Sequence, residues 1–583
     1  MKKKIILLFC IGATFGLQAQ IFEINTSFIN EIGRPSRSAN WVDINGDGFL
    51  DIYISNGPAG GANNEAYLGF GNGSFVEYDE ADPIVMDNSA SVGVTWAQAN
   101  SFPGLDLFVT TWYGDPNGFY TWTGDFYEQV EVAPPADELT YSETGAFGDA
   151  DQDGLLELYV TNSAGTDDRN NYYTATDIGA FVQLSDGIQV EEQGASRGVT
   201  WIDYDNDGDA DLFVTNEDNT PNRLYQNQGD GSFVSIQDGV VATNAGATMS
   251  GTWGDYNNDG YMDLFICNYD DDNILYRNGP NGFEEITSSV VSNDGGFSFS
   301  ANWGDLDNDG DLDLFVSNAF PQDNNSPLQN FFYLNNGDET FTKVETEIIT
   351  QNNGWTYGNA FGDYDKDGDL DLILANCFQA IEENKLYRNL TCDAEDSPTW
   401  IEVKCVGTLS NPSAIGTRVT VVATINGEVL SQTREITSQS SYCGQNMFAA
   451  HFGLGDAEVV DQLIIEWPNS PTEIYSDLES MQYFVAIEGK GPLSTAEMEE
   501  ELPAVVFPNP VTDHFIVAFD RLTEETLSMT LSDLNGKEVL DFGQIEKGRK
   551  EVRFEMPELP TGVYLLRGKG ATKAFSRKLQ VIR

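Results

Sequence analysis

The chain of 583 residues is poor in basic residues, in histidine and in cysteine. Lys and Arg together number 29 against 93 Asp and Glu, so the net charge at pH 7 is −64. A negative charge of this size repels other polyanions, and we therefore expect neither nucleic acid nor anionic lipid as a partner. The two histidines are His451 and His514, and we expect His451 to be structural. Cations are the partners that this composition favours.

After its first twenty residues the sequence has no uncharged segment long enough to span a membrane. Residues 1–20 themselves have the form of a secretory signal: residues 2–4 are all lysine, residues 5–17 are apolar, and residues 18–20 are a plausible cleavage region. The apolar stretch is shorter than the ~20 residues that a transmembrane helix needs. We therefore expect an exported mature chain that begins near Ile21 and contains no transmembrane segment.

Cysteine is scarce as well. Without Cys10, which lies in the signal, the remaining cysteines are Cys267, Cys377, Cys392, Cys405 and Cys443. Export permits disulfides, but the sequence does not determine the pairing of an odd set. A bond from Cys392 to Cys405 or to Cys443 is conceivable, whereas Cys267 lies in an apolar strand pattern that is typical of a buried residue.

What the sequence does contain is an internal repeat. Seven segments between residues 21 and 390 share an aromatic residue, an acidic loop and an apolar strand, and the loops begin at positions 43, 98, 149, 203, 255, 305 and 363. Successive copies are thus 50 to 58 residues apart, a period that is typical of a four-stranded propeller blade. The sequence predicts an all-β fold with a seven-bladed β-propeller over residues 21–390.

The two ends of this repeat region complement each other. The last copy lacks a fourth strand, and residues 21–26 resemble that strand in another copy, at residues 282–287. We expect the N-terminal strand to pair beside residues 386–388, which would close the ring and remove an exposed edge.

Six of the seven loops carry oxygen-bearing side chains at positions 1, 3, 5 and 9 and a glycine at position 6. Carboxylates crowded on one side of a tight turn repel one another unless a divalent cation lies between them. The predicted ligands, in loop order, are Asp43, Asn45, Asp47 and Asp51; Asp149, Asp151, Asp153 and Glu157; Asp203, Asp205, Asp207 and Asp211; Asp255, Asn257, Asp259 and Asp263; Asp305, Asp307, Asp309 and Asp313; and Asp363, Asp365, Asp367 and Asp371. The backbone carbonyl at position 7 is expected to complete each shell, from Phe49, Leu155, Asp209, Tyr261, Asp311 and Asp369.

Calcium is the ion that these loops favour. Position 12 is an apolar strand residue rather than the glutamate of an EF-hand, so each metal would lie on a β-hairpin loop. Magnesium retains water and strict octahedral geometry, and the loops offer no His or Cys to a transition metal. We expect about six calcium ions, mainly structural, because they would relieve the repulsion between loop carboxylates. Solvated acidic turns are the alternative interpretation, but six copies in register favour metal binding.

The second copy departs from this pattern. Its ligand positions hold Gln98, Asn100, Phe102 and Asp106, and Pro103 replaces the glycine. We expect no calcium in this loop, and we expect Trp96, Phe102 and Leu107 to form a local core that supports the blade instead.

Three groups of motifs resemble known families. An acidic loop with its following strand, as in residues 203–216, resembles the FG-GAP or VCBS repeats of integrin-type propellers. Four later motifs resemble the ASPIC/UnbV domain: Trp400-Ile-Glu-Val, Gly416-Thr-Arg-Val, His451-Phe-Gly-Leu-Gly and Ile465-Glu-Trp-Pro. A propeller followed by that domain is the arrangement of the cartilage acidic protein family, and the resemblance implies an extracellular protein.

The last residues resemble a type A sorting domain of type IX secretion. The motifs that carry this resemblance are Val506-Phe-Pro-Asn-Pro, Leu534-Asn-Gly-Lys and Leu559-Pro-Thr-Gly-Val-Tyr. It implies export across an outer membrane by the type IX machinery, removal of the domain, and secretion or attachment at the cell surface. We expect a signal at 1–20, a propeller at 21–390, an ASPIC/UnbV domain at 391–488, an acidic linker at 489–503 and a sorting domain at 504–583. The two later domains are expected to be small β-sandwiches.

The loops that join second to third strands lie opposite the calcium loops and vary most in length, which is typical of a binding surface on a rigid scaffold. In this region the aromatic side chains of Trp112, Tyr113, Tyr120 and Trp122 either stack on sugar rings or pack inside the blade. We expect a secreted or cell-surface module for binding or adhesion to a glycan or protein. The alternative is a calcium-dependent polysaccharide lyase or hydrolase, for which no isolated pair of carboxylates stands out.

Overall fold

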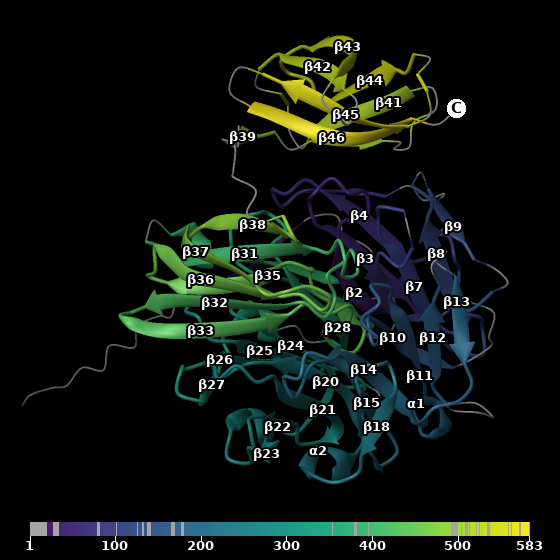
Figure 1. Ribbon diagram of the computed structural model, residues 1–583, viewed down its shortest axis with the longest axis vertical. Coiled ribbons are helices and arrows are strands. Elements are labelled where there is room, and N and C mark those ends of the chain that lie inside the picture. Colours follow the sequence, from purple (N-terminus) through teal and green to yellow (C-terminus); the bar gives the residue numbers. More distant parts are fainter. Residues whose placement is uncertain are drawn as a thin grey trace, which may run out of the picture.

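The regular secondary structure of the computed structural model is almost entirely β-strand (Figure 1). It describes residues 20–581 except for positions 27–33, 79–81, 101, 125, 131–132, 137–140, 165–168, 177–179, 324, 352–353, 378–381, 395, 491–499, 503, 508–510, 512–513, 520–521, 524, 533–536, 558, 561 and 571–572. The expected signal lies outside these residues, apart from Gln20. In the part that is described, no helix is long and apolar enough to cross a membrane.

Seven antiparallel units of four strands follow one another between residues 22 and 389 of the described chain. In unit order, the strands are β2 (Ser36–Val42), β3 (Asp51–Asn56), β4 (Glu65–Gly69) and β5 (Phe75–Glu77); β6 (Ser91–Ala97), β7 (Asp106–Thr111), β8 (Gly118–Trp122) and β9 (Tyr127–Gln129); β10 (Ser142–Gly148), β11 (Glu157–Asn162), β12 (Asn171–Ala175) and β13 (Phe181–Leu184); β14 (Ser196–Ile202), β15 (Asp211–Asn216), β17 (Arg223–Asn227) and β18 (Phe233–Ile236); β20 (Thr248–Gly254), β21 (Asp263–Asp271), β22 (Ile274–Arg277) and β23 (Glu284–Glu285); β24 (Gly296–Gly304), β25 (Asp313–Asn318), β26 (Phe331–Asn335) and β27 (Phe341–Lys343); and β28 (Thr356–Gly362), β29 (Asp371–Asn376), β30 (Lys385–Asn389) and β1 (Phe22–Ile24). Short elements lie between the units: β19 (Ala245–Gly246), α1 (Ile188–Glu191), α2 (Val240–Thr243), η2 (Val290–Ser292) and η3 (Ile348–Thr350). Within unit four, β16 (Thr220–Pro221) lies between β15 and β17, and η5 (Thr391–Asp393) follows unit seven.

The N-terminal strand completes unit seven. β1 pairs antiparallel with β30, with Phe22 opposite Asn389 and Ile24 opposite Tyr387, so the pairing expected from the sequence is confirmed. The first strands of successive units contact one another in chain order, and β28 contacts β2. The seven units therefore form a closed arrangement, which we call the ring.

Aromatic side chains seal the contacts between neighbouring units. The ring of Trp41 in unit one stacks on that of Tyr364 in unit seven at 5.5 Å, and Trp303 stacks on Tyr256 at 5.9 Å. A Cβ atom at Gly148 would lie 2.5 Å from the Trp201 ring, so the small residue permits the close approach. The aromatic residue before each acidic loop is thus a packing residue.

Residues 399–487, the middle part, form two sheets around a separate core. The strands are β31 (Thr399–Val406), β35 (Ala450–Gly455) and β38 (Gln482–Ile487) in one sheet, and β32 (Arg418–Ile425), β33 (Glu428–Glu435), β36 (Val459–Glu466) and β37 (Glu473–Glu479) in the other. Val421, Phe452 and Leu463 lie fully buried between them, as the alternation of apolar and polar residues in these strands requires.

A loop of the middle part enters the ring along its axis. Residues 438–447, the axial plug, include β34 (Gly444–Gln445), which pairs in parallel with β2. Ser438 both donates to and accepts from the backbone of Phe147 in unit three, each time at 2.8 Å. Thr252 in unit five donates to the carbonyl of Ser440 at 3.0 Å. The plug therefore joins the middle part to several units at once.

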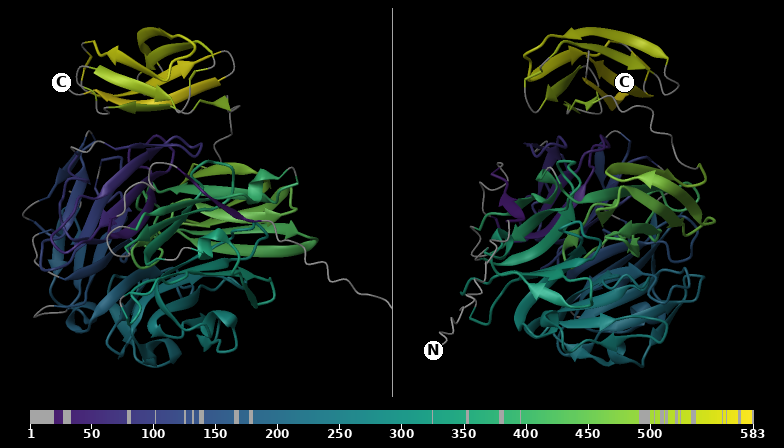
Figure 2. Two further views of the ribbon diagram at one scale, coloured as in Figure 1. Left: turned by 180° about the vertical axis from the view of Figure 1, so that it is seen from behind. Right: turned by 90° about the vertical axis from the view of Figure 1, so that its left-hand side faces the viewer.

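Residues 500–581, the C-terminal part, form two further sheets, which Figures 1 and 2 show in yellow apart from the other strands. The strands are β39 (Glu500–Glu501), β46 (Lys573–Val581), β45 (Gly562–Lys569), β42 (Leu527–Ser532) and β43 (Glu538–Ile545), and β40 (Ala504–Phe507), β41 (His514–Phe519) and β44 (Glu551–Glu555). The expected linker is partly structured, since Glu500 and Glu501 pair with β46. The five cysteines of the described residues are all free, and Cys267 is buried as expected.

Candidate functional site

Each acidic loop is folded by hydrogen bonds to its own first carboxylate. In unit four the backbone N–H groups of Asp207 and Gly208 both donate to Asp203 at 3.1 Å. The same two bonds recur in the loops of units one, five, six and seven. Position 4 has a left-handed backbone, as at Asn206 with φ of 60°. This turn places positions 1 and 3 on one side of the loop.

The carboxylate at position 9 fastens the loop to its unit. Asp313 accepts a hydrogen bond of 3.0 Å from the N–H of Leu306, at position 2, and one of 2.8 Å from the N–H of Asn335, at the end of β26. Equivalent pairs of bonds occur in units one, five and seven. The ninth residue therefore joins the loop, the second strand and the third strand.

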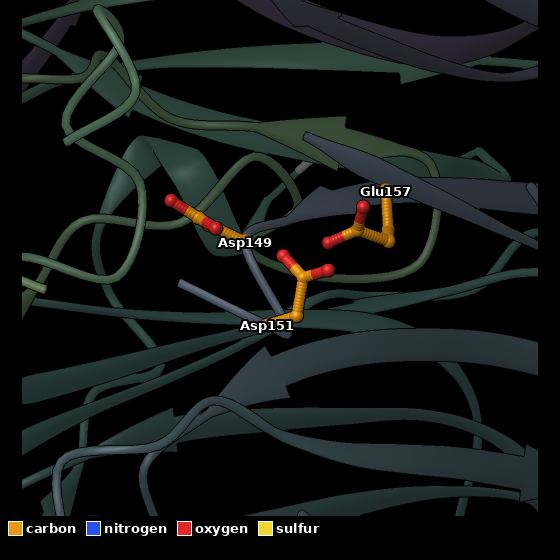
Figure 3. Close-up of side chains that lie close together, drawn as sticks. All are labelled: Asp149, Asp151 and Glu157. Atoms are coloured by element: carbon orange, nitrogen blue, oxygen red, sulfur yellow. The ribbon is translucent and has the colours of Figure 1, made fainter. Parts of the chain in front are cut away.

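In four loops the carboxylates at positions 1, 3 and 9 converge, with ligand atoms within 4.8 Å of one another. The groups are Asp149, Asp151 and Glu157; Asp203, Asp205 and Asp211; Asp305, Asp307 and Asp313; and Asp363, Asp365 and Asp371. Figure 3 shows the first group, in which the three carboxylates gather around one centre. The other two predicted loops have an amide at position 3, Asn45 or Asn257, and its oxygen is an equivalent hard ligand.

Several of these oxygens are buried and have no hydrogen-bond partner among the described residues: Asp149 Oδ2, Asp205 Oδ1, Asp211 Oδ2, Asp307 Oδ1 and Asp365 Oδ1. A buried carboxylate oxygen in this condition is costly unless a cation or water satisfies it. Burial, together with neighbouring carboxylates, raises the pKa of Asp211 to about 9 and that of Asp307 to about 7. Sets of convergent, poorly satisfied oxygen donors without nitrogen or sulfur fit a calcium ion.

The carboxylates at position 5 lie at the edge of these groups. In all six loops the position-5 side chain accepts a hydrogen bond from the N–H of position 7. In units one, five and seven its other oxygen accepts a hydrogen bond from Asn45, Asn257 and Arg388, respectively. The acidic side chains at position 7 accept hydrogen bonds from outside their own loop: Asp311 from Asn258 of the preceding unit at 2.8 Å, and Asp369 from the N–H of Cys392 at 2.8 Å. This leaves only the carbonyl of position 7 as a candidate ligand.

Consecutive loops are tied together by the side chain at position 4, which sequence reasoning missed. The amide of Asn258 donates to the carbonyl of Gly310 in the next loop at 3.2 Å, and that of Asn308 donates to the carbonyl of Gly368 at 3.0 Å. Gln152 and Asn206 make the same bond. The signal was present, since an amide recurs at position 4 of four copies.

In unit two, the described residues contain no set of converging carboxylates. Asp106 keeps both position-9 hydrogen bonds, from the N–H groups of Ala99 and Trp122, each at 2.8 Å. The amide of Asn100 donates to Asp106 at 2.6 Å, where other loops present a ligand oxygen. Trp96 and Leu107 are fully buried as expected, but Phe102 is 50% exposed. Its expected place in the core is wrong, because the core comes from the strands and Phe102 lies in the loop between them.

The middle part covers the acidic loops of units four to seven. Tyr483 donates to Asp363 Oδ2 at 2.7 Å, and the N–H of Gly453 donates to Asp305 Oδ2 at 3.0 Å. Arg418 binds Asn206 and the carbonyl of Gly260. The Nε2 atom of His451 lies 3.1 Å from the carbonyl oxygen of Gly368, and burial lowers the pKa of this histidine to about 4. His451 is a packing residue of this contact.

The four aromatic residues singled out in the sequence do not form one platform. Tyr120 is buried in the core of unit two. Trp122 lies toward the acidic-loop face and packs against Tyr127 at 5.0 Å. Trp112 and Tyr113 meet edge to face at 4.9 Å and line a pocket on the ring axis. Only these two therefore share a candidate binding surface.

This axial pocket has a volume of about 320 Å³ and lies where first strands begin and second strands end, opposite the acidic loops. Every unit contributes to it the residue that follows the first Ser or Thr of the repeat: Arg37, Val92, Glu143, Arg197, Met249, Phe299 and Tyr357. The rim adds Trp112, Tyr113, Glu217 and Phe320. Sequence reasoning missed this set, although a varying position beside a repeated Ser or Thr marks it in the aligned copies.

Three comparisons place these parts among known proteins. A family model described as FG-GAP-like repeat matches residues 203–266, 255–316 and 320–374. A model described as ASPIC and UnbV matches residues 407–492, and a secretion system C-terminal sorting domain matches residues 505–582. The resemblances stated from the motifs are thereby confirmed, and the sorting domain indicates a secreted or outer-surface protein.

Curated relatives include cartilage acidic protein 1 from Mus musculus and Homo sapiens. The mouse protein is 27% identical over 390 residues, which cover 64% of this chain and 58% of the relative. The human protein is 25% identical over 389 residues, which cover 64% of this chain and 56% of the relative. The chain thus spans somewhat more than half the length of these relatives.

Solved structures that match part of the chain include two lectins. A lectin from Agrocybe aegerita that recognises non-reducing terminal N-acetylglucosamine is 16% identical, with a TM-score of 0.37, and covers 62% of this chain and 91% of its own. The fucose-specific lectin from Aleuria aurantia is 13% identical, with a TM-score of 0.32, and covers 54% and 96%. Taken together, the matches show that the chain contains FG-GAP-like repeats, an ASPIC and UnbV segment and a secretion sorting domain, and that it is distantly similar to cartilage acidic protein 1.

Proposed function

We propose that this protein is an exported glycan-binding module built on a seven-bladed β-propeller that holds six structural calcium ions. In this proposal residues 21–390 form the propeller, residues 391–488 the ASPIC/UnbV domain, residues 489–503 a linker, and residues 504–583 a sorting domain that is removed after export. Signal cleavage near Ile21 would begin the mature chain.

The observation that carries the proposal is that the middle part covers one face of the ring and leaves a pocket open on the other. Four acidic loops are covered by the middle part, through Tyr483, Gly453 and Arg418 among others. The opposite face carries the axial pocket, with the exposed ring of Tyr113 at its rim. A mainly apolar pocket with a few charged groups and aromatic rings at its edge is a common form of ligand site. The covered face favours a structural role for calcium, and the open face favours recognition.

Position 9 supports the structural role of the ions. A cation bound to Asp313 would hold in place a side chain that already joins two strands and a loop. Calcium binding would therefore stabilise each blade and, through Tyr483 at Asp363, the contact with the middle part. Extracellular calcium modules work with dissociation constants of about 10⁻⁴ to 10⁻³ M.

A glycan array probed with the full chain, with calcium and with EDTA, tests this function. We expect retention of a defined group of glycans in calcium and loss in EDTA, because the ring would loosen without its ions. Incubation with the retained glycans should yield no new reducing or unsaturated ends. The proposal would be overturned if no glycan were retained, or if such ends appeared, since these would indicate a lyase or hydrolase.

A further inference from the structure

The axial pocket is built from a repeated scaffold whose lining side chains differ between neighbouring units. In six units the hydroxyl of the first Ser or Thr donates to the amide oxygen of an Asn in the last part of the second strand, at 2.8 to 3.1 Å. The following residue faces the pocket and changes from unit to unit. The ring therefore repeats the support and varies the lining, as expected where side chains serve recognition rather than folding.

The two arginines of this lining differ in their ion pairs: Arg197 pairs with carboxylates of the pocket, and Arg37 has no such pair among the described residues. Glu143 accepts from Arg197 Nη1 at 2.5 Å and from Trp112 Nε1 at 2.9 Å. Arg197 also binds Glu217, with its Nε at 2.7 Å from Oε2. One guanidinium thus engages both carboxylates of the pocket, and Tyr442 of the axial plug adds a further hydrogen bond to Glu143 from below, at 2.6 Å.

Arg37 is the other guanidinium of the pocket, and among the described residues no carboxylate forms an ion pair with it. Its guanidinium lies over the rings of Tyr357, at 4.4 Å, and Phe320, at 5.4 Å. Gly57 makes room for this side chain, since a Cβ atom there would lie 2.9 Å from Arg37 Cγ. Aromatic faces orient a guanidinium but do not satisfy its five N–H donors.

The surroundings of Arg37 suit a sugar ring. The pocket volume of about 320 Å³ lies at the lower end of the range for small-molecule sites, about 300–1,000 Å³. Tyr113 is 50% exposed and has a left-handed backbone with φ of 67°, so its ring is presented at the rim beside Trp112. Exposed aromatic rings of this kind offer an apolar face to the C–H side of a sugar.

We propose that the axial pocket binds a sugar residue that carries a carboxylate, such as a uronic acid, and that Arg37 pairs with this carboxylate. The inference rests on the proposed glycan-binding function and names the class of glycan. A guanidinium binds a carboxylate through two parallel hydrogen bonds. Because the net charge of the chain is −64, long-range attraction cannot bring the ligand in. The contact with Arg37 must provide the selectivity at short range.

The test compares acids with matched neutral ligands. Oligosaccharides that end in galacturonic or glucuronic acid, and their methyl esters, are titrated into the calcium-loaded full chain in a calorimeter. We expect the acids to bind at least about tenfold more tightly than the esters, as a charged hydrogen-bonded pair requires. A peptide with a free C-terminal carboxylate and its amide form the second pair of probes.

Three variants identify the residues responsible. Arg37→Gln should abolish the preference for the acid, and Arg37→Lys should restore part of it. Tyr113→Ala should weaken acid and ester by the same factor, because stacking does not depend on the charge. Arg34→Gln is the matched control: it removes the same charge three residues away, where Arg34 pairs with Glu65 at 2.9 Å, and it should leave the preference unchanged. Melting temperatures in calcium verify that each variant is folded.

The outcomes separate this inference from the proposed function. Equal binding of acids and esters, or a preference that survives in Arg37→Gln, would refute the role of Arg37 while leaving a glycan-binding module. Binding of the peptide acid alone, or of no probe at all on an array that contains neutral and acidic glycans, would overturn both.

Discussion

Replacing Asp313 by Asn tests the metal role of a ninth loop position in isolation. Asp313 is almost fully buried, belongs to a converging group with Asp305 and Asp307, and accepts hydrogen bonds from Leu306 and Asn335. Asparagine has nearly the same shape and keeps one oxygen acceptor, but it removes a negative ligand. The variant should therefore lose calcium at this loop while the fold is preserved.

The expected magnitude follows from linkage. A site with a dissociation constant of about 10⁻⁴ to 10⁻³ M contributes about 1.4 to 2.7 kcal/mol to the free energy of unfolding at about 10 mM calcium. Asp313→Asn should lower stability in calcium by that amount. In EDTA the variant loses one hydrogen-bond acceptor, which costs about 1 kcal/mol. It also removes a carboxyl that is costly to ionise in the folded state, because burial raises the pKa of Asp313 well above its usual value. The two effects offset each other. The change in EDTA should be close to zero.

Asp106→Asn in unit two is the matched control. Asp106 accepts the same two backbone hydrogen bonds, from Ala99 and Trp122, but its loop lacks the other carboxylates. Urea unfolding midpoints in calcium and in EDTA give the comparison: the loss should depend on calcium for Asp313→Asn and not for Asp106→Asn. Equal losses for Asp313→Asn under both conditions would refute the metal role of this position.

Three further predictions follow from the loops and their cover. In EDTA, the free energy of unfolding should fall as pH rises from about 4 to about 9. The carboxyls of the unfolded chain ionise near pH 4, whereas burial raises the pKa of Asp149 to about 7 and that of Asp211 to about 9 in the folded chain. Urea midpoints across this range should show the fall and saturating calcium should suppress it, whereas a rise with pH would contradict the assignment. Calcium binding at about pH 6 should release protons, which titrations in buffers of different ionisation heat detect, and zero release would mean that the ligands are already ionised. In saturating calcium, where Asp363 would be ionised as a metal ligand, Tyr483→Phe should destabilise the chain by about 1 to 3 kcal/mol in thermal or urea unfolding, since it removes a hydrogen bond to this carboxylate. An unchanged midpoint would show that this contact does not brace the seventh loop.

The architecture could be read from the sequence because it repeats. The loop register located each second strand, and the resemblance of residues 21–26 to a fourth strand located β1 beside β30. Positions 1, 3 and 9 were identifiable because a short turn fixes their geometry locally. The local pattern did not place Phe102 correctly, because the core of unit two is filled by strand residues such as Trp96 and Leu107.

The axial plug and the axial pocket could not be read in the same way. Ser438 meets Phe147 across 291 positions of the chain, and no spacing within either segment encodes that contact. The role of Arg37 depends on Tyr357 and Phe320, which lie in other units. The shared place of Arg37 and Tyr357 becomes visible only when the copies are aligned and the varying position after the first Ser or Thr is followed around the ring, and Phe320 lies outside that position, after β25.

The number of calcium ions bound by the folded chain tests the central claim most directly. Calorimetric titration of the metal-free protein, supported by elemental analysis after dialysis against millimolar calcium, should give about six ions per chain and one fewer for Asp313→Asn, with a higher melting temperature in calcium than in EDTA. A folded chain that binds no calcium, or that melts at the same temperature with and without it, would contradict the account.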